Sequence, residues 1–403
     1  MNKFKLLVII AVLPLIIPLY AETNADDWKF DDNYRHRMIF LHSFLNYELD
    51  TNWQLDWYRE RFRSSGLKVS YGSVTVKDLN SSMKAFINQE LVNDWKFLAE
   101  FDHSEKQYKH EPVHANFMGF EKRLYKQFSI FSQCHPTYDK EDIDLLLGVS
   151  LMDKLSENYF RLALNYDDFL YDEKNPRGGR VTSEPLGLKW AVRIPYKRFL
   201  LASRGKVMND SEIEFPDSSL SPNVYFERKK SDDIEIKFYY LSDKGHIAEL
   251  SLYQYFYSRQ ERFYDELQNY KYRDKITNIS IKYYHRLREN LLIKGILHYV
   301  QQESNAEGSK NYHFNRQEIL PMFLLQYKKN ATSWEIGYLR TDYELELDNN
   351  LADSSYQQSK NTQKYILRWT YNFSKFARLQ FSVSHVPNIE GYGGGNLNLM
   401  ILY

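Results

Sequence analysis

The sequence predicts an all-β fold: a single transmembrane antiparallel up-and-down β-barrel of about 18 to 20 strands. Three observations predict it. Apolar and polar residues alternate along most of the chain, short and long links alternate between these segments, and the chain begins with an export signal. The 403 residues carry 53 basic and 53 acidic side chains. This balance gives no electrostatic attraction to nucleic acid, and the single cysteine, Cys134, excludes a disulfide framework.

The amino terminus has the layout of a secretory signal peptide. A basic head, residues 1–5, precedes an apolar run over residues 6–19 and a polar stretch after Ala21. We expect a signal peptide over residues 1–21; cleavage after Ala25 and an uncleaved membrane anchor are the alternatives. No later apolar run is long enough to cross a bilayer as a helix, so a membrane-bound mature chain would cross as strands. We expect residues 22–33 to form a short periplasmic segment and residues 34–403 the barrel.

The predicted strands have a period of two. Residues 365–373 carry apolar or aromatic side chains at every odd position, and residues 379–383 repeat the pattern after a turn at Ser374-Lys375. Successive strand residues point to opposite faces, so one face is apolar and the other mostly polar. The same pattern covers residues 160–166, 186–194, 234–240, 279–283 and 334–338. Helical turns compete only at residues 154–159 and 259–268, and between residues 242 and 275 one hairpin could be gained or lost.

The links between the strands alternate in length. Tight links are predicted near Asn93-Asp94, Leu124-Tyr125, Pro195-Tyr196, Asp232-Asp233, Arg288-Glu289, Lys329-Asn330 and Ser374-Lys375. Longer polar links are predicted at residues 172–183, 209–221, 302–313 and 348–361. Short turns at one rim and long loops at the other are typical of a transmembrane barrel, whereas a soluble sandwich mixes loop lengths at both ends.

The final strand, Asn396–Tyr403, alternates apolar residues and ends on an aromatic residue. It resembles the signal by which bacterial outer-membrane barrels are recognised for assembly, and departs from it at Asn398, where that signal usually has glycine. With the export signal and the alternating links, the whole mature chain resembles a porin-like outer-membrane barrel. The resemblance implies a location in the bacterial outer membrane. It also implies three partners: the lipid bilayer, lipopolysaccharide, and the barrel-assembly machinery, which would bind the strand Asn396–Tyr403.

The polar faces of the strands are rich in basic residues. By alternation they carry Arg161, Lys189, Arg193, Lys237, Lys282, Arg286, Lys294, Lys364, Arg368 and Arg378. Fewer acids share these faces: Asp144, Asp167, Glu235, Glu318 and Glu335. A basic lining in a narrow passage concentrates anions. The alternative is that bases and acids pair and simply solvate the lumen.

Aromatic residues near the strand ends suit the two interfaces of a membrane. We expect an aromatic girdle formed by Trp190, Trp334, Trp369, Tyr371 and Tyr403, with Trp28, Trp53, Trp57 and Trp95 also assigned to it. The alternative use of aromatic rings, stacking of carbohydrate, would fall to the inward residues Tyr239 or Tyr284.

The sequence does not support an enzyme. Ser384 and His385 are adjacent on a strand, so they point to opposite faces and cannot form a nucleophile–base pair. His110 and His114 could share a metal only on a helix, which Pro112 between them disfavours. The acids at residues 142–144 and 232–233 fit solvated turns better than a calcium site. We therefore expect no catalytic residue, no metal and no cofactor.

Two classes of function remain. The first is an outer-membrane channel that passes small hydrophilic solutes, anionic ones among them, through a charged lumen. The second is a barrel that exports or assembles an envelope polysaccharide, or serves as a structural or adhesive surface protein. Only residues 22–33 separate the signal from the first expected strand near Tyr34, which argues against the amino-terminal plug of an energised receptor.

Overall fold

The computed structural model has one helix, α3 (Thr51–Glu60), followed by strands, in the part of the chain that it describes. These parts are residues 51–60, 64–73, 79–105, 113–135, 144–153, 157–166, 180–183, 186–214, 224–264, 269–308, 312–349, 354–387 and 391–403. The first strands are β1 (Gly66–Ser73), β2 (Leu79–Glu90), β3 (Trp95–Glu105), β4 (Val113–Tyr125), β5 (Phe128–Cys134), β6 (Leu145–Met152) and β7 (Tyr159–Tyr166). Next come β8 (Arg180–Ser183), β9 (Leu186–Tyr196), β10 (Phe199–Met208) and β11 (Ser211–Glu214). The last are β12 (Val224–Leu241), β13 (Ile247–Phe263), β14 (Tyr270–Arg288), β15 (Leu291–Gly308), β16 (Tyr312–Lys329), β17 (Thr332–Asn349), β18 (Ser354–Asn372), β19 (Ala377–Val386) and β20 (Gly391–Leu402).

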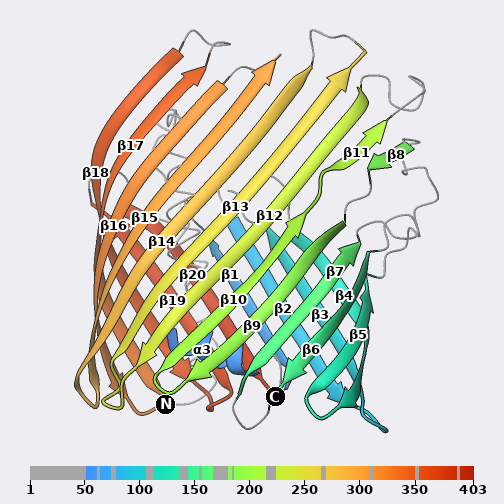
Figure 1. The fold of residues 1–403 in the computed structure, drawn as a ribbon. Helices are drawn as coiled ribbons and strands as arrows, with labels where there is room; N and C mark the ends of the chain where they lie inside the picture. Colours follow the sequence, from blue (N-terminus) through green and yellow to red (C-terminus); the bar gives the residue numbers. More distant parts are fainter. Residues whose placement is uncertain are drawn as a thin grey trace.

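These strands close into one antiparallel barrel (Figure 1). Each wall strand pairs with its neighbour in the sequence, except that β7 pairs with β9 and β10 pairs with β12. The ring is closed by β1 and β20, whose register runs from Gly66 opposite Leu402 to Ser73 opposite Gly395. The short strands β8 and β11 pair with each other, and β11 extends the wall beside β12. The wall therefore has 18 strands, which confirms the predicted single up-and-down barrel.

One rim of the barrel, here called the turn rim, carries the tight links. Lys197-Arg198 joins β9 to β10, and Asn330-Ala331 joins β16 to β17. Lys197 and Asn330 take positive φ values of 52° and 53°, the left-handed conformation that tight hairpins require of their turn residues. The carboxyl-terminal Tyr403 lies at the same rim, where its backbone exchanges hydrogen bonds of 2.7 and 2.8 Å with Ser65. The opposite rim, here called the loop rim, carries the longer links, such as the ten residues between the end of β5 and the start of β6.

Several predicted link positions are wrong. Asp232 and Asp233 lie in the middle of β12, opposite Phe256 and Tyr255 of β13, and do not form a turn. Residues 302–308 belong to β15 and residues 354–361 to β18, so the loops at these points are much shorter than predicted. The polar composition of these segments suggested loops, but the backbone pairing of the neighbouring strands continues through them. Residues 242–275 resolve into one hairpin turn, the strand β13 and the start of β14, and residues 259–263 are strand rather than helix.

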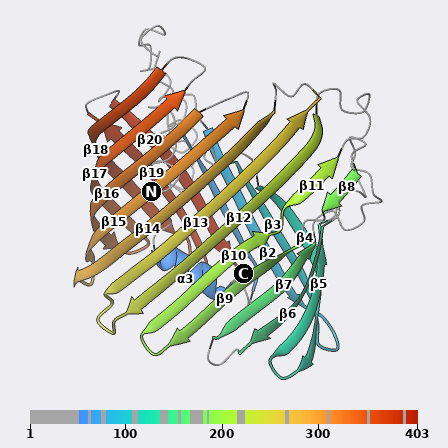
Figure 2. The same cartoon turned by 45° about the horizontal axis from the view of Figure 1, so that its top comes forward.

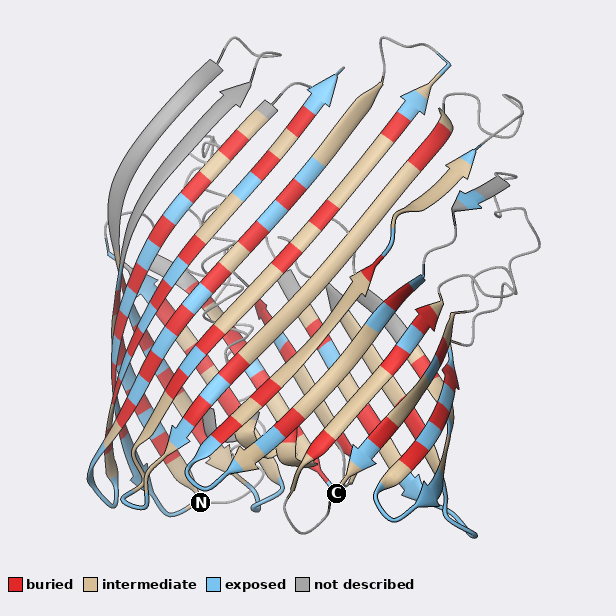
Figure 3. Cartoon of the chain, viewed as in Figure 1, coloured by how far each residue is buried: buried red, intermediate tan, exposed pale blue. Residues whose placement is uncertain are grey.

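The two faces of the wall differ as the alternation predicted. In β14 the even-numbered residues from Asp274 to Tyr284 are buried, whereas Ile281 and Tyr283 are exposed (Figure 3). The exposed set in β16 contains Ile319, Phe323 and Leu325. Large apolar side chains therefore cover the outside of the barrel, and polar and charged side chains are directed inward together with some apolar ones. No helix in the described ranges is long and apolar enough to span a bilayer.

The barrel has a long and a short sector. Strands β12–β18, the long sector, contain 17 to 19 residues each, and β1–β7, the short sector, contain 7 to 13. A transmembrane strand needs about 9 to 11 residues, so the long sector extends well beyond the thickness of a bilayer. The extension lies toward the loop rim, because both sectors end together at the turn rim (Figure 1).

The amino-terminal predictions concern a part of the chain that is mostly outside the described residues. The signal peptide, its cleavage position, the segment 22–33 and the first expected strand near Tyr34 all precede Thr51 and stay predictions. Residues 51–60, assigned to the barrel wall, instead form the helix α3. The wall needs no strand from this segment, because β1 pairs directly with β20.

Candidate functional site

Helix α3 lies inside the barrel near the turn rim (Figures 1 and 2). Its side chains contact β10 and β12 on one side of the lumen and β1, β2, β19 and β20 on the other. In the 18-strand ring β1 and β12 are separated by nine steps, so these contacts are on opposite walls. The helix thus bridges the lumen at this level.

One attachment of α3 is built around Tyr58. Its hydroxyl donates a hydrogen bond of 2.9 Å to Oε2 of Glu235 on β12. The same carboxylate accepts from Nε of Arg204 at 2.6 Å and pairs with Nζ of Lys237 at 2.8 Å. Burial, and then the charge of Glu235, raise the pKa of Tyr58 to about 12, so near neutral pH the hydroxyl keeps its proton and donates. The ring packs against Leu200 and other apolar side chains of this wall.

The second attachment is on the opposite wall. Asp56 forms an ion pair with Arg378 of β19, one of the predicted lumen bases. Trp57 packs edge-on against Phe86 of β2 with ring centroids 4.8 Å apart, and Lys68 of β1 lies 5.9 Å from the Trp57 ring. Trp57 therefore belongs to the interior, and its assignment to the outer girdle is wrong. The sequence pattern could not distinguish these two places, because a Trp suits both.

The predicted lumen bases are mostly paired with acids. Nζ of Lys282 lies 3.1 Å from Oε1 of Glu249, and Nζ of Lys294 lies 2.5 Å from Oε1 of Glu335. The remaining carboxylate pairs are Arg368 with Glu335 at 3.5 Å, Arg193 with Glu157 at 2.9 Å, Lys189 with Glu100 at 3.9 Å, Lys237 with Glu235, and Arg378 with Asp56. Sequence alternation found the bases, but four of these acids were not among the predicted partners: Asp56, Glu100, Glu157 and Glu249.

Three of the predicted bases have other surroundings. Arg161 donates a 2.8 Å hydrogen bond to Oε1 of Gln133 and lies flat against Phe131 at 3.7 Å. Arg286 is exposed at the turn rim, beside Gly245. Lys364 is buried on the inner face of β18, on the same side as Arg368.

The inner wall of the long sector is dry. Arg316, Leu320, Leu324 and His298 all have 0% exposure on the inward face. Arg316 forms an ion pair with Glu318 two residues along the same strand. Charged and apolar side chains are both withdrawn from solvent, so the lumen along this wall is not a wide water-filled pore in this conformation.

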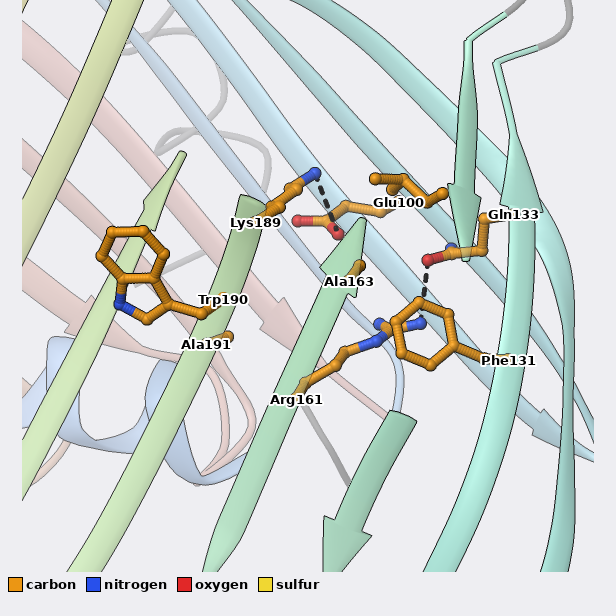
Figure 4. Close-up of a pocket in the computed structure, with 9 residues that line it drawn as sticks. Glu100, Phe131, Gln133, Arg161, Ala163, Lys189, Trp190 and Ala191 are labelled. Atoms are coloured by element: carbon orange, nitrogen blue, oxygen red, sulfur yellow. Dashed lines mark hydrogen bonds and ion pairs between the residues drawn. The ribbon is translucent and has the colours of Figure 1, made fainter. Parts of the chain in front are cut away.

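The short sector leaves a small cavity between its inward side chains. Arg161 and Lys189 line it, and their partners Gln133 and Glu100 complete the polar part (Figure 4). Its volume is about 30 Å³, which is room for a water molecule or two. It is too small to hold a solute, and a water molecule in it could bind Nε2 of Gln133 and Nε of Arg161, which have no hydrogen-bond partner in the protein.

The outer face carries aromatic residues close to the turn rim. Trp334 of β17 and Trp369 of β18 are directly opposite in the register, with ring centroids 6.2 Å apart, and Tyr371 lies 6.0 Å from Trp369. Trp190 is on the same face of β9, where its Nε1 donates a 3.0 Å hydrogen bond to Ser203. Tyr403 is 71% exposed. Trp334 and Trp369 lie two and three residues from the turn-rim ends of their strands, whereas Trp190 lies six residues from the end of β9, so Trp190 is at a different level from the other two.

The geometry offers little for catalysis or metal binding. Ser384 is buried and donates to the carbonyl of Gly394 at 2.9 Å, while His385 is exposed on the other face. Within the described ranges no group of three histidine, cysteine or acidic side chains could hold a metal ion. His110 lies outside these ranges, as do Asp142 and Ile143.

Comparisons with known proteins show no family for this chain. No protein-family model and no curated protein matches the chain. Solved structures do match, each over 84% of this chain: a bacterial polysaccharide outer membrane secretin (6% identity, TM-score 0.40, 98% of that chain), OmpT of Vibrio cholerae (9%, 0.39, 96%) and a porin (10%, 0.33, 99%).

The apolar exterior decides the class. A closed antiparallel ring with an apolar outside, a polar inside, tight turns at one rim and longer loops at the other is built to sit in a bilayer. The chain is an outer-membrane β-barrel. The predicted resemblance and the predicted location in the outer membrane are both confirmed at this level.

Proposed function

We propose that the barrel is an outer-membrane channel for small hydrophilic solutes, held closed in this conformation by helix α3. One observation carries the proposal: α3 is attached to opposite walls of the lumen, through Tyr58 and Glu235 on one side and Asp56 and Arg378 on the other. The helix therefore narrows the path of a solute through the turn rim. Other large barrels likewise have interiors plugged by a loop or a helix.

The ion pairs of the inner wall support weak rather than strong ion selectivity. An anion filter needs unpaired bases at a constriction, whereas seven of the nine bases assigned to the lumen, Lys364 not counted, have a carboxylate partner. Paired charges cancel much of each other's field. We therefore propose that solutes are chosen by size and polarity more than by the sign of their charge.

Planar-bilayer conductance tests the proposal. The refolded native protein should be closed for most of the recording, whereas Asp56→Arg should open it, because this change places two like charges where the ion pair was. The double variant Asp56→Arg/Arg378→Asp restores an attractive pair and should close the barrel again. Asp243→Arg is the matched control, because it makes the same charge reversal in an exposed ion pair with Arg198 that does not include the helix.

The outcomes separate the two classes of function. Increased open probability in Asp56→Arg, reversed in the double variant, supports a closed channel. Absence of conductance in all four proteins, each shown to be folded by its heat-modifiable migration in gel electrophoresis, would refute the channel and favour a structural barrel. A salt gradient across the same bilayer measures the ion selectivity.

A polysaccharide path is the second candidate, and one observation favours it. Inward tyrosines follow one another along β13, at Tyr253, Tyr255 and Tyr257, and continue at Tyr239 and Tyr284 of the neighbouring strands. Such a series could stack sugar rings. Four of these five rings are nearly inaccessible, with exposures of 1 to 3%, so a polymer would first have to uncover them. For this reason we place the small-solute channel first.

A further inference from the structure

On the outward face of the long sector, each strand changes from mainly polar to mainly apolar side chains. Adjacent strands place Ile236, Leu252, Ile279, Tyr299 and Ile319 side by side in one row of the register. From this row to the turn rim the outward side chains are mainly apolar, for example over the nine residues Ile319–Tyr327. This is the length of a tilted transmembrane strand, so on each strand the residue of this row marks one end of the apolar, lipid-facing stretch.

Directly above this end of the stretch, β14 carries three successive outward bases. They are Lys271, Arg273 and Lys275, here called the basic strip, and they alternate with the buried or half-buried residues Tyr272 and Asp274. Arg273 and Lys275 are exposed, and Lys271 is partly so. The register adds two bases on the neighbouring strands.

These two bases flank the basic strip. Lys230 of β12 is in the same row as Ser258 of β13 and Arg273. Arg262 of β13 is exposed and lies 5.0 Å from the ring of Phe226, which leaves its polar edge open to solvent. Five basic side chains therefore gather on the outward faces of three adjacent strands.

The acids nearby do not neutralise the basic strip. Glu303 and Glu307 of β15 stand opposite Lys275 and Lys271 in the register, and Asp232 of β12 pairs with Lys230 at 3.7 Å. None of the three bases of the strip is within ion-pair distance of a carboxylate in the described part of the chain. Exposed, unpaired bases in a row are suited to charge-assisted hydrogen bonds with phosphate oxygens.

The depth of the basic strip in the membrane indicates which ligand it can bind. Long loops of outer-membrane barrels are extracellular, so the strip faces the outer leaflet. Lys275 is four residues above Ile279, which is about 13 Å along the strand and about 10 Å along the membrane normal for a strand tilted by about 40°. That is the depth of phosphorylated headgroups rather than of acyl chains.

We propose that the basic strip on β14, with Lys230 and Arg262, binds the phosphate groups of lipopolysaccharide in the outer leaflet. Lipopolysaccharide was expected from the sequence as a general partner; the structure assigns it a specific site on one side of the barrel. The site is on the outer face of the barrel and does not involve the lumen. Its test is therefore separate from the test of the channel proposal.

Titration of the detergent-solubilised barrel with diphosphoryl lipid A, followed by native mass spectrometry, tests this site. The triple variant Lys271→Glu/Arg273→Glu/Lys275→Glu should bind lipid A about tenfold or more weakly, because three charge-assisted contacts are replaced by repulsion. The triple variant with glutamine at the same positions should lie between the two. The matched control reverses three exposed bases of the turn rim, Lys197, Lys329 and Lys375, and should bind like the native protein.

The form of the lipid identifies the recognised group. Dephosphorylated lipid A and phosphatidylglycerol should bind the native protein more weakly than diphosphoryl lipid A, and inorganic phosphate should compete only weakly. Equal loss in the strip reversal and in the turn-rim reversal would show that only overall charge matters and would overturn the proposal. So would unchanged binding in the strip variant, or equal affinity for lipid A without its phosphates.

Discussion

The long and short sectors place the same kind of ion pair in different surroundings. In the long sector, Lys294 and Glu335 are 2% and 1% exposed. In the short sector, the pair Lys84–Asp102 has the same separation of 2.5 Å but is 20% and 24% exposed. Water screens the second pair and is excluded from the first. Register and alternation therefore determine which residues pair. The packing of the lumen determines how much each ion pair contributes to the free energy of unfolding.

The largest expected effect comes from breaking the dry cluster. Glu335→Gln removes the shared partner of Lys294 and Arg368 and should lower the free energy of unfolding by about 3–5 kcal/mol, because it leaves buried charges unpaired. Asp102→Asn in the short sector should cost about 1 kcal/mol or less. Urea unfolding in lipid vesicles measures both, and equal losses would contradict the contrast between the sectors.

The next effect tests where the lipid band of the long sector ends. Phe323→Arg places a charge on the outward face at the middle of the nine-residue band Ile319–Tyr327 and should destabilise the barrel by about 2–4 kcal/mol, as charges do near the bilayer midplane. Gln317→Arg, six residues nearer the loop rim on the same face, should cost about 0–1 kcal/mol. The same unfolding measurement applies. A similar cost at both positions would mean that the band extends above the row of Ile279.

The smallest effect concerns the aromatic girdle. Trp369→Leu removes the ring contacts with Trp334 and Tyr371 and should cost about 0.5–1.5 kcal/mol beyond the lost apolar area. A double-mutant cycle with Trp334→Leu isolates the contribution of the ring pair. A coupling energy near zero would mean that the rings meet without stabilising each other.

Much of the wall could be predicted from the sequence because the side-chain period of a strand is a local property. Residues 365–373 and 379–383 were predicted with the correct faces, and the turn between them lies where expected. The errors have a common cause. Polar segments such as residues 302–308 were interpreted as loops, yet they are strands whose outward face is above the membrane, where polar residues are favoured on both faces.

The helix α3 could not be found from local pattern. Its ten residues contain two tryptophans and mixed charges, which fit a girdle strand as well as a lumen helix. The decisive contacts, Tyr58 with Glu235 and Asp56 with Arg378, join residues 177 and 322 positions apart. No spacing in the sequence connects such residues.

The amino-acid order alone determined the strands, their apolar outer face and the bases that point inward, since each of these depends on neighbours two residues away. The three-dimensional arrangement decided which acid pairs with each base and that α3 spans the lumen. It also decided that the long sector extends further toward the loop rim than the short sector. These features depend on which strands stand opposite one another after the ring closes, and closure is a property of the whole chain.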